Sequence, residues 1–594
     1  MAVRGYTVRS MKTLFAAAIV ALAPAPALAQ GIVSSADPRA AEAGREILRA
    51  GGTATDAAMA MMLALTVVEP QSSGIGGGGF LIHHDGKSGA IDTIDGREKA
   101  PAAASPNRFL GPDGKPRPFV ELFPGGQSVG VPGNVRLMAL AHKKWGKLPW
   151  KALFEPAIRL AEQGYQVTRP MAASSAMLAP LWFGRRISAS TPTAPTGQPV
   201  AGDDSTTIVP TADAFPDVAA LYAPGGRPLT EGMTVRNPAL AATLRTLADE
   251  GADAFYTGES AQRLVDTVTQ SKVAPSDMTL ADLTAYQAAE RPAVCTRYRT
   301  YKLCGMGPPS SGATTVFQIL GMLERFDMKK LGKDSPVAWH LISEAMLLAY
   351  ADREKYLGDP DFVSVPVAGL LDRGYIASRS KRLSTTKSLG TYEAGTPPGA
   401  QPRTAAIQNE TPGTTHFIAV DRQGDVVTMT STVEGPFGSQ LVAGGYVLNN
   451  ELTDFTAAPE KNGAPVANRV EPGKRPLSSM SPTIVYDAKG QPIFTVGAAG
   501  GKTIIMQVAK ALIAHLDWGE NARDSIGEGL IFFNDAGLIL EEGTGRVALK
   551  PALEALGHTV TIGKLGLKAN AAERTASGWV GAADPRSVGV ALKE

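Results

Sequence analysis

The character of the sequence changes at Gly413-Thr414-Thr415-His416-Phe417, which joins a segment rich in Pro, Gly and Thr to the first predicted strand of the C-terminal part. A threonine hydroxyl is a weak nucleophile unless a base lies beside it. Cleavage of the chain before Thr414 would supply that base, because the new α-amino group titrates at about pH 8 and is partly neutral near neutral pH. On these residues alone an ordinary strand start is the simpler interpretation, since threonine is common in strands.

Residue patterns on both sides of this stretch predict strands between groups of helices. Residues 393–413 indicate an exposed linker, and residues 186–231 indicate a surface excursion. Apolar spacing predicts strands at 80–83, 90–94, 415–421, 426–432, 445–448, 482–486 and 492–496, and helices at 40–50, 54–65, 134–145, 150–163, 239–250, 260–269 and 504–516. This order favours α/β layers built on an antiparallel sheet.

Residues 1–29 have the features of an export signal. Arg4, Arg9 and Lys12 precede the apolar run 14–23, and Ala27-Leu28-Ala29 matches the small-x-small pattern of a cleavage site. The apolar run has about half the length that a membrane span needs, and no later stretch is long and apolar enough to cross a bilayer. We therefore expect export and no stable membrane span. The destination would be the periplasm if the source is a Gram-negative bacterium, and the outside of the cell otherwise.

Charge and composition exclude several classes of function. The chain has 58 Lys and Arg against 56 Asp and Glu, a net charge of +2 that becomes −1 when the signal is removed. This balance gives no electrostatic reason to expect a nucleic-acid partner. The seven histidines are scattered without metal-ligand spacing, and two cysteines cannot form a Cys-based zinc site, so we expect no metal.

The two cysteines lie in a stretch that predicts a strand, a short turn and a second strand. If Arg299-Thr300 forms a two-residue turn, Cys295 and Cys304 face each other across the hairpin. Export makes a disulfide between them chemically possible. Two buried free thiols are the alternative.

Three glycine-rich segments resemble other motifs only by letter. Gly74-Ile-Gly-Gly-Gly-Gly79 is followed by a strand, whereas a dinucleotide fingerprint requires a helix there. The segment around Ser128 is separated from the next helix by Val-Pro-Gly, which argues against a nucleophile elbow. Gly497-Ala-Ala-Gly-Gly-Lys-Thr503 is one residue short of a phosphate-binding loop. Its backbone N–H groups at a helix start would suit a developing anion instead.

Taken together, the sequence resembles the γ-glutamyltranspeptidase family of N-terminal-nucleophile hydrolases. The matching stretches occur in family order along the chain. They are Asp56-Ala-Ala58, Glu69-Pro-Gln-Ser-Ser-Gly-Ile-Gly-Gly-Gly78, Asp95-Gly-Arg-Glu-Lys-Ala-Pro101, Ser128-Val-Gly-Val-Pro-Gly133, Pro308-Pro-Ser-Ser-Gly312, Ala351-Asp-Arg353, Thr414-Thr-His416, Leu448-Asn-Asn-Glu-Leu-Thr-Asp-Phe455, Arg475-Pro-Leu-Ser-Ser-Met-Ser-Pro482, Gly500-Gly501 and Asp584-Pro-Arg586. Each match is weak alone, and their common order makes the resemblance specific.

The resemblance implies a four-layer αββα sandwich, with two stacked and mainly antiparallel sheets between helical layers. It also implies self-cleavage between Gly413 and Thr414, which gives a large subunit of residues 30–413 and a small subunit of residues 414–594 in one shared unit. The mature Thr414 would attack the γ-amide of a glutathione-like donor and form an acyl-enzyme. Water, an amino acid or a peptide amine would accept the acyl group, and no cofactor would be needed.

The resemblance also assigns roles to single residues. Arg97, Ser478 and Ser479 would bind the α-carboxylate of the donor, and Glu451 and Asp454 would bind its α-ammonium group. Thr432 would position the nucleophile, and the N–H groups of Gly500 and Gly501 would form the oxyanion hole, in which one donor is worth about 3–4 kcal/mol. Thr415 would be a supporting residue, and His416 a structural one.

Two departures from the family qualify the choice of substrate. Glu434 stands where well-known members have Asn. If it faces the pocket, three acids crowd one ammonium, which raises at least one carboxyl pKa and disfavours a glutaryl donor. If it points away, donor specificity differs. Residues 456–474 are too short for the full lid of some members, which predicts a site open to larger substrates.

Two alternatives to a γ-glutamyl hydrolase and transpeptidase stay open at this stage. A cephalosporin (glutaryl) acylase or another N-acyl amidohydrolase of the same family would use the same nucleophile. An unprocessed binding protein on this fold would use none.

Overall fold

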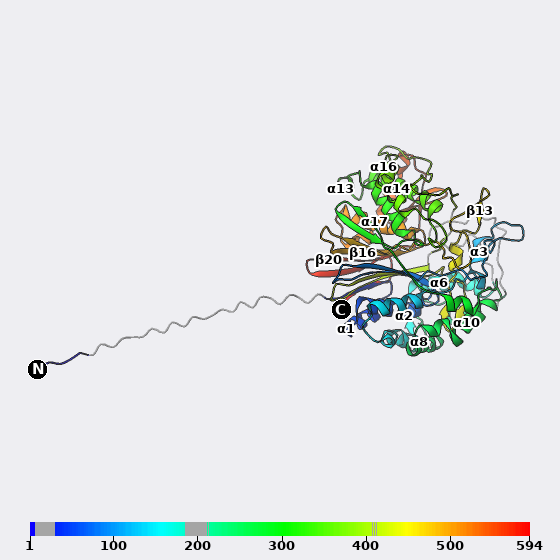
Figure 1. The fold of residues 1–594 in the computed structure, drawn as a ribbon, viewed down its shortest axis with the longest axis horizontal. Helices are drawn as coiled ribbons and strands as arrows, with labels where there is room; N and C mark the ends of the chain where they lie inside the picture. The colour runs from blue at the N-terminus through cyan, green and yellow to red at the C-terminus, as the bar shows by residue number, and fades with distance from the viewer. Residues whose placement is uncertain (6–29, 185–210, 212, 407, 409, 412) are drawn as a thin grey trace.

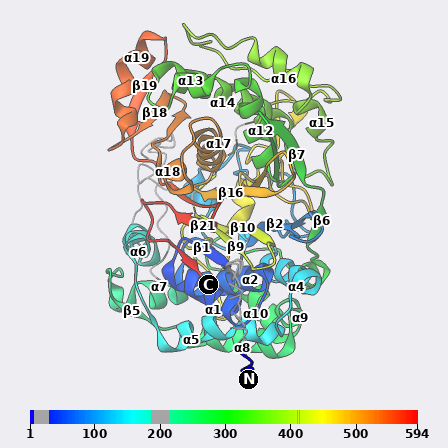
Figure 2. The same cartoon turned by 90° about the vertical axis from the view of Figure 1, so that its left-hand side faces the viewer.

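Two antiparallel sheets lie face to face in the computed structural model, and helices cover the outer face of each sheet (Figures 1 and 2). The structure describes residues 1–5, 30–184, 211, 213–406, 408, 410, 411 and 413–594. The predicted four-layer αββα sandwich is therefore confirmed. Most of the predicted signal peptide lies outside the described residues.

The first sheet contains the cleavage site predicted from the sequence. Its strand order is β22-β1-β9-β10-β2-β3-β6. The strands are β1 (Ile32–Ser35), β2 (Gly78–His84), β3 (Ile91–Asp95), β6 (Ala289–Arg291), β9 (Gly413–Val420), β10 (Val426–Glu434) and β22 (Val590–Lys593). Strands that precede Gly413 in the sequence thus pair with strands that follow it, so the two expected subunits share this sheet.

The second sheet packs directly on the first. Its order is β21-β20-β16-β15-β8-β7, with β7 (Val294–Tyr298), β8 (Tyr301–Gly305), β15 (Thr483–Tyr486), β16 (Pro492–Ala499), β20 (Lys568–Thr575) and β21 (Gly578–Ala583). Strand β9 contacts both β16 and β20. At Gly497 of β16 the sheets approach so closely that a Cβ atom would lie 2.2 Å from the His416 ring.

Helices bury the outer faces of both sheets. The first sheet is covered by a layer that includes α1 (Pro38–Arg49), α2 (Ala54–Val68), α4 (Asn134–Trp145), α5 (Glu155–Gln163) and α8 (Pro238–Glu250). The second is covered by α12 (Gly312–Leu323), α14 (Pro336–Tyr356) and α17 (Thr503–Leu516). Helix α2 is apolar on every face and fully buried, as expected of a helix in the middle of a layer. A capping box between Thr53 and Asp56 fixes its start.

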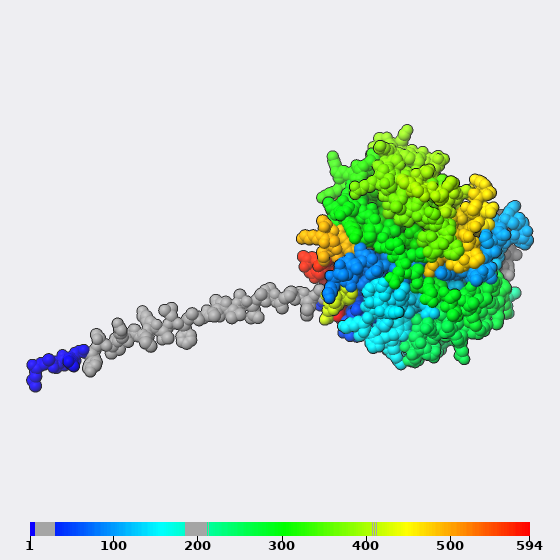
Figure 3. Space-filling model, viewed as in Figure 1, coloured from blue at the N-terminus to red at the C-terminus, as the bar shows by residue number. Residues whose placement is uncertain are grey.

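Shorter elements complete the layers. The remaining helices are α3 (Phe119–Leu122), α6 (Arg169–Trp182), α7 (Pro216–Tyr222), α9 (Asp253–Tyr256), α10 (Gly258–Thr269), α11 (Leu280–Ala285), α13 (Met328–Leu331), α15 (Val367–Leu370), α16 (Arg373–Ser380), α18 (Ala522–Gly527) and α19 (Lys550–Ala555). The remaining strands are β4 (Tyr165–Gln166), β5 (Thr234–Val235), β11 (Val442–Ala443), β12 (Tyr446–Val447), β13 (Glu460–Lys461), β14 (Ala464–Pro465), β17 (Ile531–Asn534), β18 (Gly537–Glu541) and β19 (Val560–Gly563). On the surface, segments from both halves of the chain form one continuous body (Figure 3).

Two expectations about irregular segments hold for only part of the described residues. Within residues 186–231, of which 185–210 and 212 lie outside the described part, helix α7 buries Val218 and Tyr222 in the core. Within residues 393–413, the side chains of Gln408 and Thr411 are buried rather than exposed. Residues 393–406 have the irregular backbone and largely the exposure that composition predicted, but composition carries no information about the polar groups that bury Gln408 and Thr411.

The cysteine hairpin forms as the spacing predicts. Strands β7 and β8 pair with Cys295 opposite Cys304, and Arg299-Thr300 connects them. The two cysteines form a disulfide. Among the helices of the described residues, none has the length and apolar character needed to cross a bilayer.

The close approach of the sheets at Gly497 predicts a stability effect. Gly497→Ala places a methyl group against the hydrogen-bonded His416 ring and should destabilise the fold by about 1–3 kcal/mol, seen as a lower urea midpoint. Gly545→Ala is the matched control, because its Cβ atom would meet no atom within 4 Å. Equal midpoints for the two variants would contradict the packing described here.

Candidate active site

The pairing of β9 with β10 places two threonine hydroxyls next to the predicted cleavage site. Thr414 lies opposite Thr432, and their hydroxyl oxygens are 3.1 Å apart. The Thr432 hydroxyl donates a hydrogen bond to the carbonyl oxygen of Gly413 at 2.9 Å. The backbone N–H of Glu434 donates to Thr432 Oγ1 at 2.8 Å.

These contacts fix the direction of the hydrogen bond between the two threonines. A hydroxyl has one proton and two lone pairs. The Thr432 proton goes to the Gly413 carbonyl, because a carbonyl can only accept, and one lone pair accepts from Glu434. The remaining lone pair can only accept, so Thr414 is the donor. Thr432 thus accepts the hydroxyl proton of Thr414 in a hydrogen bond, and its own hydroxyl polarises the carbonyl of Gly413.

A bulge in β10 makes this geometry possible. The register shifts between Thr432 and Glu434, and Glu434 has a positive φ of 74°. Gly413 pairs with Glu434 so closely that a Cβ atom on Gly413 would lie 2.2 Å from the Glu434 carbonyl oxygen. Glycine is therefore required at the residue before Thr414 for a steric reason.

The Glu434 side chain faces the site and holds the segment before Gly413. Its Oε1 accepts a hydrogen bond from the Thr411 N–H at 2.8 Å and another from the Thr411 hydroxyl, and its Oε2 accepts one from the Asn450 amide. Burial raises the pKa of Glu434 to about 7, although these donors act in the opposite direction. Of the two sequence-based alternatives, the one with Glu434 in the pocket is correct.

Arg97 is the buried cation of the site. Its guanidinium forms ion pairs with Glu451 and with Asp454, the latter at 2.5 Å, and donates to the backbone carbonyl of Leu477 at 2.9 Å. Burial raises the pKa of Glu451 and of Asp454 well above their usual values, against the effect of Arg97. Glu98, whose Oε2 lies 4.0 Å from Arg97, has a pKa raised to about 8 by burial.

The serine pair is reached by a second buried cation and by the segment that precedes Thr414. Ser479 donates a hydrogen bond to Glu410 Oε1 at 2.9 Å and accepts one from Arg353 Nη2 at 2.9 Å. Arg353 also forms an ion pair with Glu410. The Ser478 hydroxyl accepts from the Met480 N–H at 3.2 Å. The Glu410 carboxylate of the chain itself therefore accepts the hydrogen bond of the Ser479 hydroxyl, one of the two serine hydroxyls predicted to bind the donor.

The glycine pair lies at the turn between β16 and α17. Gly500 and Gly501 have φ values of +136° and +57°, which side chains other than glycine rarely adopt. Gly501 lines the same cavity as Thr414. Within the described residues, neither backbone N–H is recorded as a hydrogen-bond donor, which leaves both suited to an oxyanion.

The predicted site residues meet around one small cavity of about 10 Å³, which has room for about one water. Its lining consists of Arg97, Glu410, Thr411, Thr414, Thr432, Glu434, Glu451, Asp454, Ser478, Ser479, Met480, Gly501 and Ile504. The structure thus brings together every predicted residue except Gly500, which is adjacent, and Gly413, whose carbonyl binds Thr432. With Glu410 and Thr411 in its lining, a cavity of this volume leaves no space for a donor molecule.

Thr415 and His416 point away from this cavity. The Thr415 hydroxyl donates a hydrogen bond to Glu69 at 2.5 Å, and Lys568 Nζ donates to both Thr415 and Glu69. The His416 ring is buried between the sheets and bonded to the hydroxyls of Thr428 and Thr430. Burial lowers its pKa to about 3, so the ring stays neutral and its role is structural.

The glycine-rich segment around Ser128 has a structural role. Ser128 sits in a short 3-10 turn and donates a hydrogen bond to the carbonyl of Phe123 at 2.8 Å.

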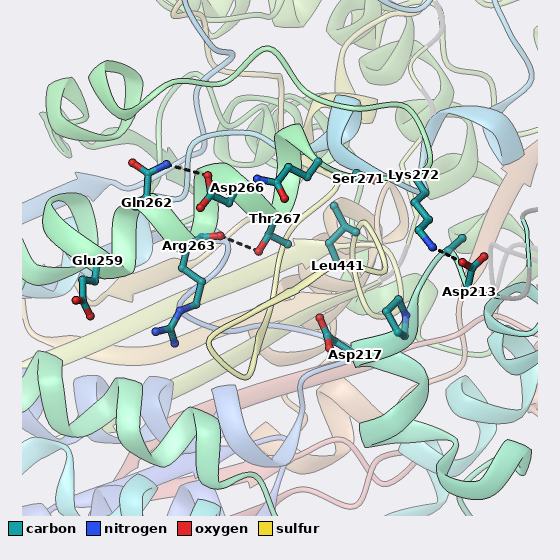
Figure 4. Close-up of a pocket in the computed structure, with 13 residues that line it drawn as sticks. Asp213, Asp217, Glu259, Gln262, Arg263, Asp266, Thr267, Ser271, Lys272 and Leu441 are labelled. Atoms are coloured by element: carbon teal, nitrogen blue, oxygen red, sulfur yellow. Dashed lines mark hydrogen bonds and ion pairs between the residues drawn. The ribbon is translucent and has the colours of Figure 1, made fainter.

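A wider cavity of about 550 Å³ lies beside α7 and α10 (Figure 4). Its described lining includes none of the predicted site residues, so it is separate from the chemistry at Thr414.

Sequence reasoning missed four residues that belong to the segment before Thr414 or bind the side chains that hold this segment. They are Arg353, Glu410, Thr411 and Asn450, of which Arg353 and Asn450 lie inside the quoted family stretches without an assigned role. The available signal for Glu410 and Thr411 was their closeness to the cleavage site. A residue two or three positions before a reacting bond must lie near the groups that act on it.

Comparisons with known proteins show which family the chain belongs to. The family described as Gamma-glutamyltranspeptidase matches residues 40–593. The "Glutathione hydrolase proenzyme" of Bacillus subtilis (strain 168) is 37% identical over 538 residues, which cover 89% of this chain and 85% of that protein. The protein of the same name from Escherichia coli (strain K12) is 35% identical over 592 residues, covering 94% and 91%. A cephalosporin acylase structure from Bacillus halodurans aligns with a TM-score of 0.78 at 26% identity, covering 98% of this chain and 99% of that one.

The stacked antiparallel sheets, with a threonine at the start of a central strand, are the fold of the N-terminal-nucleophile hydrolases. Within that class, the chain belongs to the γ-glutamyltranspeptidase family.

The buried His416 predicts a loss of stability in acid. The unfolded chain takes up a proton near the ordinary histidine pKa of about 6.5, whereas the folded chain does so only near pH 3. The contribution is therefore complete above about pH 6.5 and declines as the pH falls toward 3, by about 2 kcal/mol between pH 7 and pH 5. Urea unfolding of Thr414→Ala, which keeps one chain, should show this loss. The double variant with His416→Asn should show a smaller one, and equal losses would contradict the assignment.

Proposed function

We propose that the chain is a proenzyme that cleaves itself between Gly413 and Thr414 and then acts as a γ-glutamyl hydrolase and transpeptidase. The observation that carries the proposal is the Thr432 hydroxyl, which contacts both the Thr414 hydroxyl and the Gly413 carbonyl. Family membership supports the same activity.

Self-cleavage follows from these two contacts. The Thr414 oxygen attacks the Gly413 carbonyl carbon, the bond from that carbon to the Thr414 nitrogen breaks, and the hydroxyl proton moves to the departing amine. Water then hydrolyses the resulting ester, which releases the Gly413 carboxylate and restores the Thr414 hydroxyl. The new α-amine of Thr414 acts as the base in later turnovers.

After cleavage, the charged groups of the donor would take the positions that groups of the uncut segment occupy in the cavity. Its α-carboxylate would take the position of the Glu410 carboxylate at Ser479, with Arg97 in reach as the family pattern implies. Its α-ammonium would be held by Glu451 and Asp454. The N–H groups of Gly500 and Gly501 would stabilise the oxyanion that forms at the γ-carbonyl.

The acids around Arg97 favour a γ-glutamyl over a glutaryl donor. Glu451 and Asp454 share the single guanidinium of Arg97, and Glu434 lines the same cavity, so the electrostatics there favour an additional cation. A glutaryl group carries no ammonium and would leave these carboxylates without a new partner. The acylase alternative remains the second candidate because a cephalosporin acylase shares the fold.

The proposed enzyme would have amine acceptors, two associated fragments and a location outside the cytoplasm. Amino acids and peptides would compete with water for the acyl-enzyme as amine acceptors. The two fragments of one precursor would stay together, because β9 lies between β1 and β10 in a shared sheet. The signal-like residues 1–29 support export, to the periplasm in a Gram-negative cell.

Self-cleavage makes a direct prediction for Thr414→Ala. The wild-type chain should give two bands on a denaturing gel, and N-terminal sequencing of the smaller one should start at Thr414. Thr414→Ala should give one full-length band, because no hydroxyl attacks Gly413. Thr415→Ser is the matched control and should still be cleaved. A single wild-type band after prolonged incubation would favour an unprocessed binding protein.

The donor preference is tested with paired anilides. The kcat/KM for a γ-glutamyl anilide should exceed that for the glutaryl anilide by at least about 100-fold, since only the first carries the ammonium group. Asp454→Asn should reduce this ratio. Asp361→Asn, which removes a half-exposed carboxylate outside the cavity, should leave it unchanged. A preference for the glutaryl substrate would identify the chain as an acylase.

A further inference from the structure

Two histidines and a glutamate meet on the far side of the second sheet, where α14 packs against the chain around α19 (Figure 2). His340 and Glu344 are four residues apart on α14 and therefore share one face of the helix. His558 follows α19 and lies 218 residues further along the chain than His340. All three side chains are buried, and one ligating atom of each lies within 4.8 Å of the others.

Hydrogen bonds determine which nitrogen of His340 is available as a ligand. Its Nε2 lies 2.8 Å from the carbonyl oxygen of Ser384, which can only accept, so Nε2 carries the proton. Nδ1 therefore holds a lone pair and accepts a hydrogen bond from the Nε2–H of His558 at 2.7 Å, so a metal ion between the rings would replace this proton, which His558 would release or carry on its Nδ1 instead. Metal-bound histidines are oriented in this way, with the far nitrogen donating to a backbone carbonyl.

Glu344 supplies a buried carboxylate beside the two rings. Its oxygens accept hydrogen bonds from the Leu389 N–H at 3.0 Å and from the Tyr392 hydroxyl, which fixes the side chain in place. Its Oε1 lies 3.8 Å from His558 Nε2. In the part of the chain that the structure describes, no lysine or arginine forms an ion pair with Glu344. A buried carboxylate without such a partner favours a bound cation.

We propose that His340 Nδ1, His558 Nε2 and Glu344 Oε1 bind a zinc ion. Two histidines and one glutamate are a recurrent zinc ligand set. His558 also lines a cavity of about 310 Å³ together with Tyr392 and Asn534, which gives room for water as a fourth ligand. Zinc–nitrogen bonds of about 2.0–2.1 Å place two ligand nitrogens about 3.3 Å apart, so the rings must separate by about 0.6 Å on binding.

The position of the site gives the ion a structural role. His340 and Glu344 precede the cleavage site and His558 follows it, so the zinc ion would join the two fragments. This bridging role rests on the proposed cleavage, whereas zinc binding itself does not. The same helix carries Arg353, which contacts Ser479 in the active site. Fixing α14 would therefore also hold Arg353 in position.

The spacing of the histidines does not predict this site. The expectation of no metal rested on local motifs, and here two ligands one helical turn apart meet a third from a distant part of the sequence. Only the packing of α14 against the α19 region brings them together.

Equilibrium dialysis of the untagged chain against zinc sulfate, with metal analysis, tests the proposal. Both the wild type and Thr414→Ala should bind one zinc per chain at micromolar free zinc, which separates this test from the cleavage proposal. His558→Gln and Glu344→Gln should each weaken binding by about 100-fold, since each removes a ligand. His515→Gln is the matched control, because His515 is another partly buried helical histidine near a single glutamate.

Two further measurements make the outcome decisive. Cobalt in place of zinc should give the visible absorption of a four-coordinate site in the wild type, and His558→Gln should lack it. In the cleaved wild type, zinc should raise the thermal unfolding midpoint, and in cleaved His558→Gln it should not. A folded wild type without stoichiometric zinc, or ligand variants that bind like the wild type, would overturn the site. Zinc binding without a change in midpoint would overturn the bridging role.

Discussion

The hydroxyl of Thr432 is the contact on which the active site depends. With one proton and two lone pairs it bonds the Gly413 carbonyl, the Glu434 N–H and the Thr414 hydroxyl, so its hydrogen-bonding capacity is used completely. This requires the exact pairing of β9 with β10 and the bulge that ends β10. It also requires that Gly413 has no side chain, because the opposite strand lies too close. Local backbone geometry thus decides where the chain can react.

The shared sheet explains how the proposed cut in the middle of the chain would leave the fold intact. Cleavage would fall after Gly413, the first residue of β9, so only the pairing of Gly413 with Glu434 would be lost from the ladder. The rest of β9 stays paired with β1 on one side and β10 on the other, and packed on β16. The proposed fragments would therefore be held together by main-chain hydrogen bonds and by a core to which both contribute.

Strand and helix positions were predictable from the sequence because apolar spacing reports burial directly. The cysteine hairpin followed from its two-residue turn, since short antiparallel connections fix which residues oppose each other. The role of Thr432 beside Thr414 came from the family resemblance, and the structure places the two residues opposite each other. The burial of Gln408 and Thr411 was not predictable, because it depends on Glu434 and Arg353, which other parts of the fold bring there. The same holds for the cluster around His558, which no local pattern contains.

Electrostatics connects processing to donor binding. In the uncut chain, the negative charge of Glu410 raises the pKa of both Glu434 and Asp454, in addition to the larger effect of burial. Withdrawal of the segment after cleavage would remove that charge and open the cavity, and both changes favour the ionised carboxylates. A donor ammonium would lower the pKa values of Glu434, Glu451 and Asp454 further, because it is an opposite charge within the same site. On this proposal, the acids would become a strong binding site for the donor only after the Glu410 carboxylate has left.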